Sequence, residues 1–110
     1  MKLNHFHVYV SDLSGSIEWM DHIWQKKPGY KDNQMTSFAF DSVTMILDTF
    51  DQDIPCTIGF ASENCDHDYQ QVIKRGAISI EEPKNKEWGV RAAYIKGPGK
   101  LTFEIEQNLR

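Results

Sequence analysis

The sequence predicts an α+β fold made of two modules that share one order of elements, βαβββ. Residues 3–10 alternate between apolar and polar side chains, which is the period-two pattern of a strand with one buried face. Apolar residues recur at helical spacing over residues 17–24, directly after that strand. A shift of 52 residues, from His5 to Thr57, lays a second strand and helix over the first pair, which indicates an internal duplication.

The first half begins with a strand whose two faces differ in chemistry. One face carries Phe6, Val8 and Val10, and the other carries Leu3, His5, His7 and Tyr9. The segment "SDLSGS" supplies capping residues for a helix, and Pro28 with Gly29 ends the helical stretch. Two further strands, 35–42 and 43–50, are expected to pair through a tight turn near Asp41–Ser42.

The second half repeats this order. Its expected elements are a strand at 56–62, a helix at 63–76, and strands at 77–83, 88–96 and 100–107. The segment "KGPGK" predicts a hairpin turn, and it lacks the helix that must follow a phosphate-binding loop. The chain is therefore predicted to be one domain, 1–110, with module 1 at about 1–53 and module 2 at about 54–110.

Composition limits the classes of function. A net charge of −4 with scattered basic residues leaves no basic stripe for nucleic acid. The apolar runs are too short to span a membrane, and the N-terminus has no signal-peptide pattern. Cys56 and Cys65 occur in no metal-binding or redox spacing, so both are expected to be free thiols in a reducing compartment. We therefore expect a cytoplasmic protein that binds neither nucleic acid nor membranes.

Four stretches of the sequence together resemble the motifs of one protein family. The stretch "NHFHVYVSDLSGSIEW" is similar to that family's first strand and D-L-x-x-S-x-x-F/W helix entry, and "VTMILD" to the strand closing its first module. The stretch "IGFASENCDHDYQQVIKRGA" resembles the entry and helix of the second module. The stretch "EEPKNKEWGVRAAYIKGPGKLTFEIEQ" is similar to the family's ending. By these motifs the chain resembles the vicinal oxygen chelate superfamily, which includes glyoxalase I, bleomycin-resistance proteins and extradiol dioxygenases. The likeness covers nearly the whole chain and rests on the order and spacing of the motifs.

The resemblance implies two βαβββ modules that form a curled mixed β-sheet around a central cavity, with the helices on the outside. It also implies a homodimer. A polar and partly aromatic sheet face suits the lining of such a cavity. The sequence offers two such faces, one with His5, His7 and Tyr9 and the other with Thr102, Glu104 and Glu106.

Metal-dependent members of the superfamily place ligands on four strands. By the resemblance, these positions fall on His5, Ile46, Thr57 and Glu104, of which only the first and last are good ligands. Because His7 shares a face with His5, the set His5, His7 and Glu104 is an alternative site for zinc, iron or manganese. The other interpretations of the two histidines are cavity lining without a metal, which we favour, and simple surface exposure.

The ligand-binding residues expected on this basis are His5, His7, Tyr9, Trp88, Arg91 and Glu104. Phe38 or Phe40 is expected to add an aromatic wall. Arg91 has two interpretations, an ion pair with Glu104 or Glu106 and a planar clamp for an anionic ligand.

The favoured hypothesis is a glyoxalase/bleomycin-resistance-like protein that binds a small molecule in the cavity without a metal. The first alternative is a metal-dependent lyase, isomerase or dioxygenase that uses His5, His7 and Glu104, with Glu104 or a histidine moving a proton. The second alternative is a non-catalytic interaction module. The sequence leaves open whether the chain is an enzyme and which ligand it binds.

Overall fold

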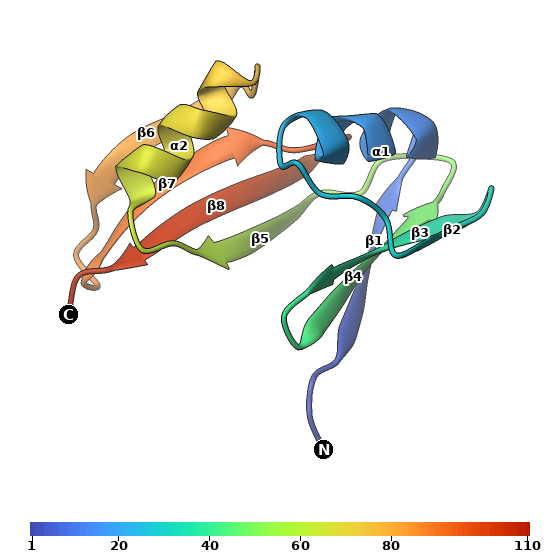
Figure 1. Cartoon of the computed structure of the whole chain (residues 1–110), viewed down its shortest axis with the longest axis horizontal. Coiled ribbons are helices and arrows are strands. Elements are labelled where there is room, and N and C mark those ends of the chain that lie inside the picture. Colours follow the sequence, from blue (N-terminus) through green and yellow to red (C-terminus); the bar gives the residue numbers. More distant parts are fainter. The chain divides into compact units, whose positions relative to one another are not determined.

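Each half of the chain folds as a βαβββ module in the computed structural model, which describes all 110 residues (Figure 1). One unit contains residues 1–55 and 98–100, and the other contains residues 56–97 and 101–110. The duplication and the α+β class predicted from the sequence are confirmed.

Module 1 is a four-stranded sheet with one helix. Its elements are β1 (His5–Val10), α1 (Leu13–His22), β2 (Tyr30–Lys31), β3 (Met35–Phe40) and β4 (Val43–Thr49). The strand order is β1-β4-β3-β2, in which β1 is parallel to β4 and the other pairs are antiparallel. The sequence pattern does not predict β2, because two residues are too few to display an alternation.

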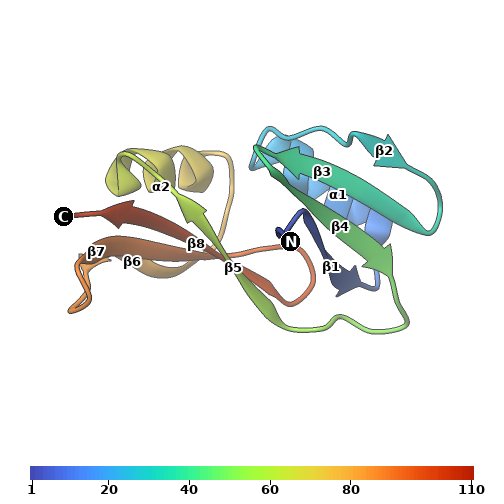
Figure 2. The ribbon, with the colours of Figure 1, turned by 90° about the horizontal axis from the view of Figure 1, so that it is seen from below.

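Helix α1 covers one face of this sheet, and in the view of Figure 2 it lies behind β3 and β4. The Asp12 carboxylate caps the helix by accepting a hydrogen bond from the Gly15 amide at 2.9 Å. Met20 is buried as the helical stripe predicts, whereas the helix ends at His22 and leaves Trp24 beyond it. The buried apolar residues of the strands are Val8, Val10, Phe38, Met45 and Leu47.

Module 2 repeats this architecture. Its elements are β5 (Cys56–Ala61), α2 (Cys65–Lys74), β6 (Ser79–Asn85), β7 (Val90–Lys96) and β8 (Leu101–Asn108). The order is β5-β8-β7-β6, with β5 parallel to β8 and the other pairs antiparallel. β6 begins later than the predicted residue 77, because Ala77 still belongs to the helix terminus. Its amide donates a hydrogen bond to the Val72 carbonyl at 2.9 Å.

Helix α2 packs on one face of the second sheet (Figure 1). The Asn64 side chain caps it by accepting a hydrogen bond from the His67 amide at 3.1 Å. The buried residues of the helix are Cys65, Tyr69 and Val72, and those of β7 and β8 include Ala93, Ile95, Leu101, Phe103 and Ile105. No helix of the chain is long and apolar enough to cross a membrane.

Each sheet therefore has one face packed under a helix and one face without a helix. The strand alternation places His5, His7 and Tyr9 on the second kind of face in module 1, and Thr102, Glu104 and Glu106 in module 2. We call these the uncovered faces of the two modules. These faces carry most of the side chains that the sequence predicts for a binding site.

Candidate functional site

The uncovered face of module 1 is centred on the parallel pair of β1 and β4. The Cα partners of His5, His7 and Tyr9 are Thr44, Ile46 and Asp48, respectively. In β4 these three residues alternate with the buried Met45 and Leu47. Strand β1, which carries three of the predicted site residues, thus lies beside β4, which contributes the carboxylate of Asp48.

His7 and Asp48 form a hydrogen-bonded pair on this face. His7 Nδ1 lies 2.5 Å from Asp48 Oδ2, and the two side chains are 41% and 25% exposed. The His5 ring meets the His7 ring edge to face with centroids 5.3 Å apart. His5 Nδ1 lies 2.5 Å from the side-chain oxygen of Asn4. Both imidazoles are therefore oriented through Nδ1 by a neighbouring oxygen atom.

Tyr9 and Phe50 add an exposed aromatic pair next to His7 and Asp48. Their ring centroids are 5.7 Å apart at an interplanar angle of 61°, and both residues are more than a third exposed. An edge-to-face aromatic pair is a stable arrangement of two rings, and its exposed edges and faces offer apolar area to a ligand. Phe50 is not among the predicted site residues, although it is the last residue of the strand expected at 43–50; in the structure β4 ends one residue earlier, at Thr49.

The uncovered face of module 2 is centred on Glu104. The Tyr94 hydroxyl donates a hydrogen bond to Glu104 Oε2 at 2.7 Å from the neighbouring strand β7. On the other side, Gly59 of β5 is the Cα partner of Glu104, and a Cβ atom there would lie 3.3 Å from Oε1. The missing side chain at Gly59 leaves room for the carboxylate over β5.

A lysine extends this cluster toward β6. The Lys86 ammonium forms an ion pair with Glu81 and lies 5.5 Å from the centroid of the Tyr94 ring. Its side chain is only 12% exposed, and the Lys84 ammonium also lies 3.4 Å from Glu81. The hydrogen bonds from the two lysines, that of Lys86 foremost, lower the pKa of the Glu81 carboxyl. Lys86 therefore contacts both the Glu81 carboxylate and the Tyr94 ring, and Tyr94 in turn is hydrogen-bonded to Glu104.

Carboxylates surround the Tyr94 hydroxyl and raise its pKa. The hydrogen bond to Glu104 is the largest cause that raises the pKa of Tyr94 to about 12, followed by burial of the phenol. The negative charges of Glu104, Glu81 and Glu106 raise it further. Charges that disfavour a phenolate at this place favour a bound cation or a hydrogen-bond donor for the same reason.

Arg91 lies on the helix-covered face of module 2. Its Nε donates to Asp66 Oδ2 at 2.7 Å and its Nη2 donates to Oδ1 at 2.9 Å, a bidentate pair with the first turn of α2. This hydrogen-bonded pair lowers the pKa of the Asp66 carboxyl and raises the pKa of Arg91. The expected ion pair is thus formed with Asp66, and Glu104 and Glu106 are not its partners.

The remaining aromatic residues that the sequence predicts for the binding face are Trp88 and either Phe38 or Phe40. Trp88 is 58% exposed and lies in the turn between β6 and β7, where the Gly89 amide donates to the Lys86 carbonyl. Phe38 and Phe40 belong to the helix-covered face of module 1, so the prediction that one of them adds a wall to the binding face is wrong. The reason is strand parity, because Phe38 is the Cα partner of the buried Met45.

Within each module, the donor atoms present do not make up a metal centre. Ile46, where the resemblance implies a ligand, is the Cα partner of His7 and offers no donor atom. The Tyr94 hydroxyl occupies one oxygen of Glu104, Oε2, and Asp48 occupies one nitrogen of His7, Nδ1. No three His, Cys, Asp or Glu side chains are grouped so that they could hold a metal ion. The chemistry of the site is therefore derived from the chain's own side chains.

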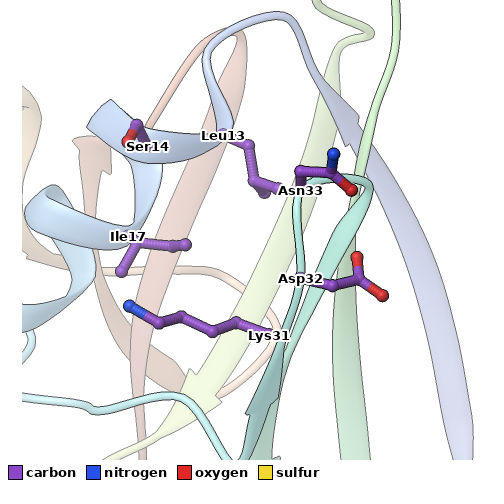
Figure 3. A pocket seen from close by; sticks show the side chains of 6 residues that line it. All are labelled: Leu13, Ser14, Ile17, Lys31, Asp32 and Asn33. Atoms are coloured by element: carbon purple, nitrogen blue, oxygen red, sulfur yellow. The ribbon is translucent and has the colours of Figure 1, made fainter.

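A separate hollow of about 390 Å³ lies in module 1 between the first turns of α1 and the segment that follows β2 (Figure 3). It is lined by Leu13, Ser14, Ile17, Lys31, Asp32 and Asn33. Figure 3 shows Asp32 pointing away from Ile17. The Tyr30 hydroxyl donates to this carboxylate at 2.7 Å, and that bond is the largest cause of its lowered pKa. None of the predicted ligand-binding residues lines this hollow.

Comparison with solved structures identifies the fold. The crystal structure of a glyoxalase/bleomycin resistance protein/dioxygenase from Nocardioides matches with a TM-score of 0.86 and 15% identity, over 100% of this chain and 85% of that one. A member of the same superfamily from Sphaerobacter thermophilus matches with a TM-score of 0.82 and 15% identity over 98% of each chain. A glyoxalase-related enzyme from Fulvimarina pelagi matches with a TM-score of 0.82 and 9% identity, over 98% of this chain and 88% of that one.

These structural neighbours over nearly the full length of the chain are members of the glyoxalase/bleomycin resistance protein/dioxygenase superfamily. The expected α+β fold with two βαβββ modules is confirmed, as two mixed four-stranded sheets. The sequence matches no family model and no curated protein.

Proposed function

We propose that this chain, which has the glyoxalase/bleomycin-resistance fold, binds a cationic small molecule through the uncovered faces of its sheets. The observation that carries the proposal is the contrast between the two faces of each sheet. One face is apolar and packed under a helix, whereas the other carries carboxylates, imidazoles and aromatic rings in positions open to a ligand.

Charge on the uncovered face of module 2 favours a cation. Glu104 and Glu106 project from β8, whereas the nearby Glu81 is already paired with Lys84 and Lys86. Glu104 already holds a neutral donor, the Tyr94 hydroxyl, which orients the carboxylate without neutralising it. The negative net charge of the chain adds a long-range attraction for the same kind of ligand.

The proposed activity is binding without a chemical step. Sequestration requires affinity and selectivity, and it does not require a nucleophile or a metal that stabilises a transition state. The hydrogen-bonded pairs on the two faces hold their side chains in fixed orientations before a ligand arrives. Such preorganisation lowers the entropic cost of binding.

The homodimer implied by the resemblance and the cytoplasmic location are also proposals. Size-exclusion chromatography with light scattering tests the first, and cell fractionation tests the second.

Thermal unfolding with added ligand tests the proposed function. We expect bleomycin or benzamidine, both cationic, to raise the unfolding temperature, because a ligand that binds only the folded state stabilises it by mass action. Benzoate, which is anionic, serves as the matched control compound. Glu104→Gln combined with Glu106→Gln is expected to weaken binding of the cationic compounds by about tenfold or more, since two charge-assisted contacts are lost.

Glu18→Gln, on the exposed surface of α1, is the control variant and is expected to bind like the parent. Equal stabilisation by benzoate, or an unchanged shift in the double variant, would contradict the proposal. So would the absence of any shift with both cationic compounds.

A further inference from the structure

The pair of His7 and Asp48 determines how the uncovered face of module 1 presents its imidazole. An ionised carboxylate can only accept hydrogen bonds, so the short contact of 2.5 Å between Asp48 Oδ2 and His7 Nδ1 requires a proton on Nδ1. In a neutral imidazole the other nitrogen then has no proton. Asp48 thus selects the tautomer of His7 in which Nε2 is a hydrogen-bond acceptor.

The surroundings of His7 leave this acceptor available. The side chain is 41% exposed, and its ring is hydrogen-bonded through Nδ1. From β1 it is flanked by His5, whose ring makes an edge contact, and from β4 by Ile46 and Asp48. Asp48 is the one carboxylate among these neighbours, so the pair with a neutral imidazole carries one negative charge.

The aromatic pair of Tyr9 and Phe50 lies directly beside the negative charge of Asp48. Tyr9 is the Cα partner of Asp48, and its ring meets that of Phe50 edge to face at 5.7 Å. Tyr9 and Phe50 are 40% and 43% exposed, which leaves ring area for a planar or apolar group. The acceptor nitrogen of His7, the negative charge of Asp48 and an aromatic surface therefore adjoin one another within one module.

We infer that His7, positioned by Asp48, accepts a hydrogen bond from an N–H donor of the ligand, and that the ligand combines a protonated amine or amidine with an aromatic group. This inference rests on the proposed function and specifies the ligand class for module 1. A quaternary ammonium compound has the same charge and no N–H, so it lacks the contact. A carboxylate ligand meets the charge of Asp48 and is disfavoured.

The first test needs no ligand. Nitrogen-15 NMR of the histidine rings, at about pH 8 where an ordinary imidazole is neutral, reports which nitrogen of each ring carries the proton. We expect His7 to be protonated on Nδ1 in the parent chain. Asp48→Ala is expected to remove this preference, and Asp48→Asn to retain it, because the amide oxygen still accepts. His22 and His67, both exposed on helices, are the internal references, and their spectra are expected to stay unchanged.

The second test compares two probes, phenethylamine and its N,N,N-trimethyl derivative, by NMR titration of the same labelled chain. We expect phenethylamine to shift the His7 Nε2 signal and to bind about tenfold more tightly than the quaternary compound, which corresponds to one charge-assisted hydrogen bond. In Asp48→Ala the difference between the probes is expected to disappear, while Asp48→Asn keeps part of it.

The outcomes separate this inference from the proposed function. A proton on Nε2 of His7 in the parent chain overturns the inference, whatever the chain binds. Equal affinity for both probes, or no binding of phenethylamine by a chain that bleomycin or benzamidine stabilises, also overturns it and leaves the proposed function intact. Failure of phenethylamine, bleomycin and benzamidine alike overturns both.

Discussion

Replacing Phe103 by alanine is expected to lower the free energy of unfolding by about 3–5 kcal/mol, as deletion of a buried aromatic side chain does. Phe103 is 0% exposed and has buried Ile95 as its Cα partner on β7. Its ring also meets that of Phe60 edge to face at 5.3 Å. The change removes a large apolar surface and leaves a cavity under α2, which closely packed neighbours fill only in part.

Phe50→Ala is the matched control for this prediction. It removes the same side chain from an exposed position, so the expected loss is about 1 kcal/mol or less. Denaturant unfolding followed by circular dichroism measures both values. A loss below about 1.5 kcal/mol for Phe103→Ala would contradict the assignment of this residue to the core of module 2.

Alkaline conditions are expected to remove the stabilisation that Tyr94 provides. The hydrogen bond to Glu104 is the foremost reason that its pKa is raised to about 12 from the ordinary value of 10.0. Since the folded state binds this proton more tightly than the unfolded state, the contribution is fully present below pH 10. It is lost as the pH rises from about 10 through about 12.

The size of this effect follows from the difference between the two pKa values. A difference of two pH units corresponds to about 2.7 kcal/mol, and partial exposure of the phenol reduces it to about 1–2 kcal/mol. Unfolding curves of the parent and of Tyr94→Phe at several pH values isolate the contribution, because every other tyrosine is common to both chains. The stability difference is expected to shrink between about pH 10 and 12. A difference that stays constant over this range would show that Tyr94 does not hold its proton through Glu104.

The fold could be predicted from the sequence because its signals are local. Alternation along β1 and β8 identifies which residues share a face, and the capping and breaking residues mark the ends of α1 and α2. The duplicated order then fixes the module type. Only β2, at two residues, was too short to produce such a signal.

The partners within the candidate site depend instead on pairing between distant segments. Asp48 reaches His7 because β1 and β4 pair in parallel, and alternation within β1 contains no information on that register. Arg91 and Tyr94 are three residues apart on β7 and therefore lie on opposite faces, which the resemblance to a cavity-mouth motif does not reveal.

One pairing could have been found from the sequence. Once "KGPGK" is recognised as a hairpin turn, pairing outward from it aligns Lys96 with Thr102 and Tyr94 with Glu104, as the structure has them. The short loop fixes the register of its two strands. Tyr94 would then have been identified as the hydrogen-bond partner of the principal carboxylate.

Isothermal titration of the chain with bleomycin and with benzamidine, in buffer with and without excess EDTA, tests whether the chain binds a cation without a metal. We expect saturable binding of a cationic compound with the same affinity in both buffers, because the uncovered faces bind through carboxylates, an imidazole and aromatic rings. Binding that EDTA abolishes would instead assign His5, His7 and Glu104 to a metal centre. That result, or the absence of binding in both buffers, would contradict the proposed function.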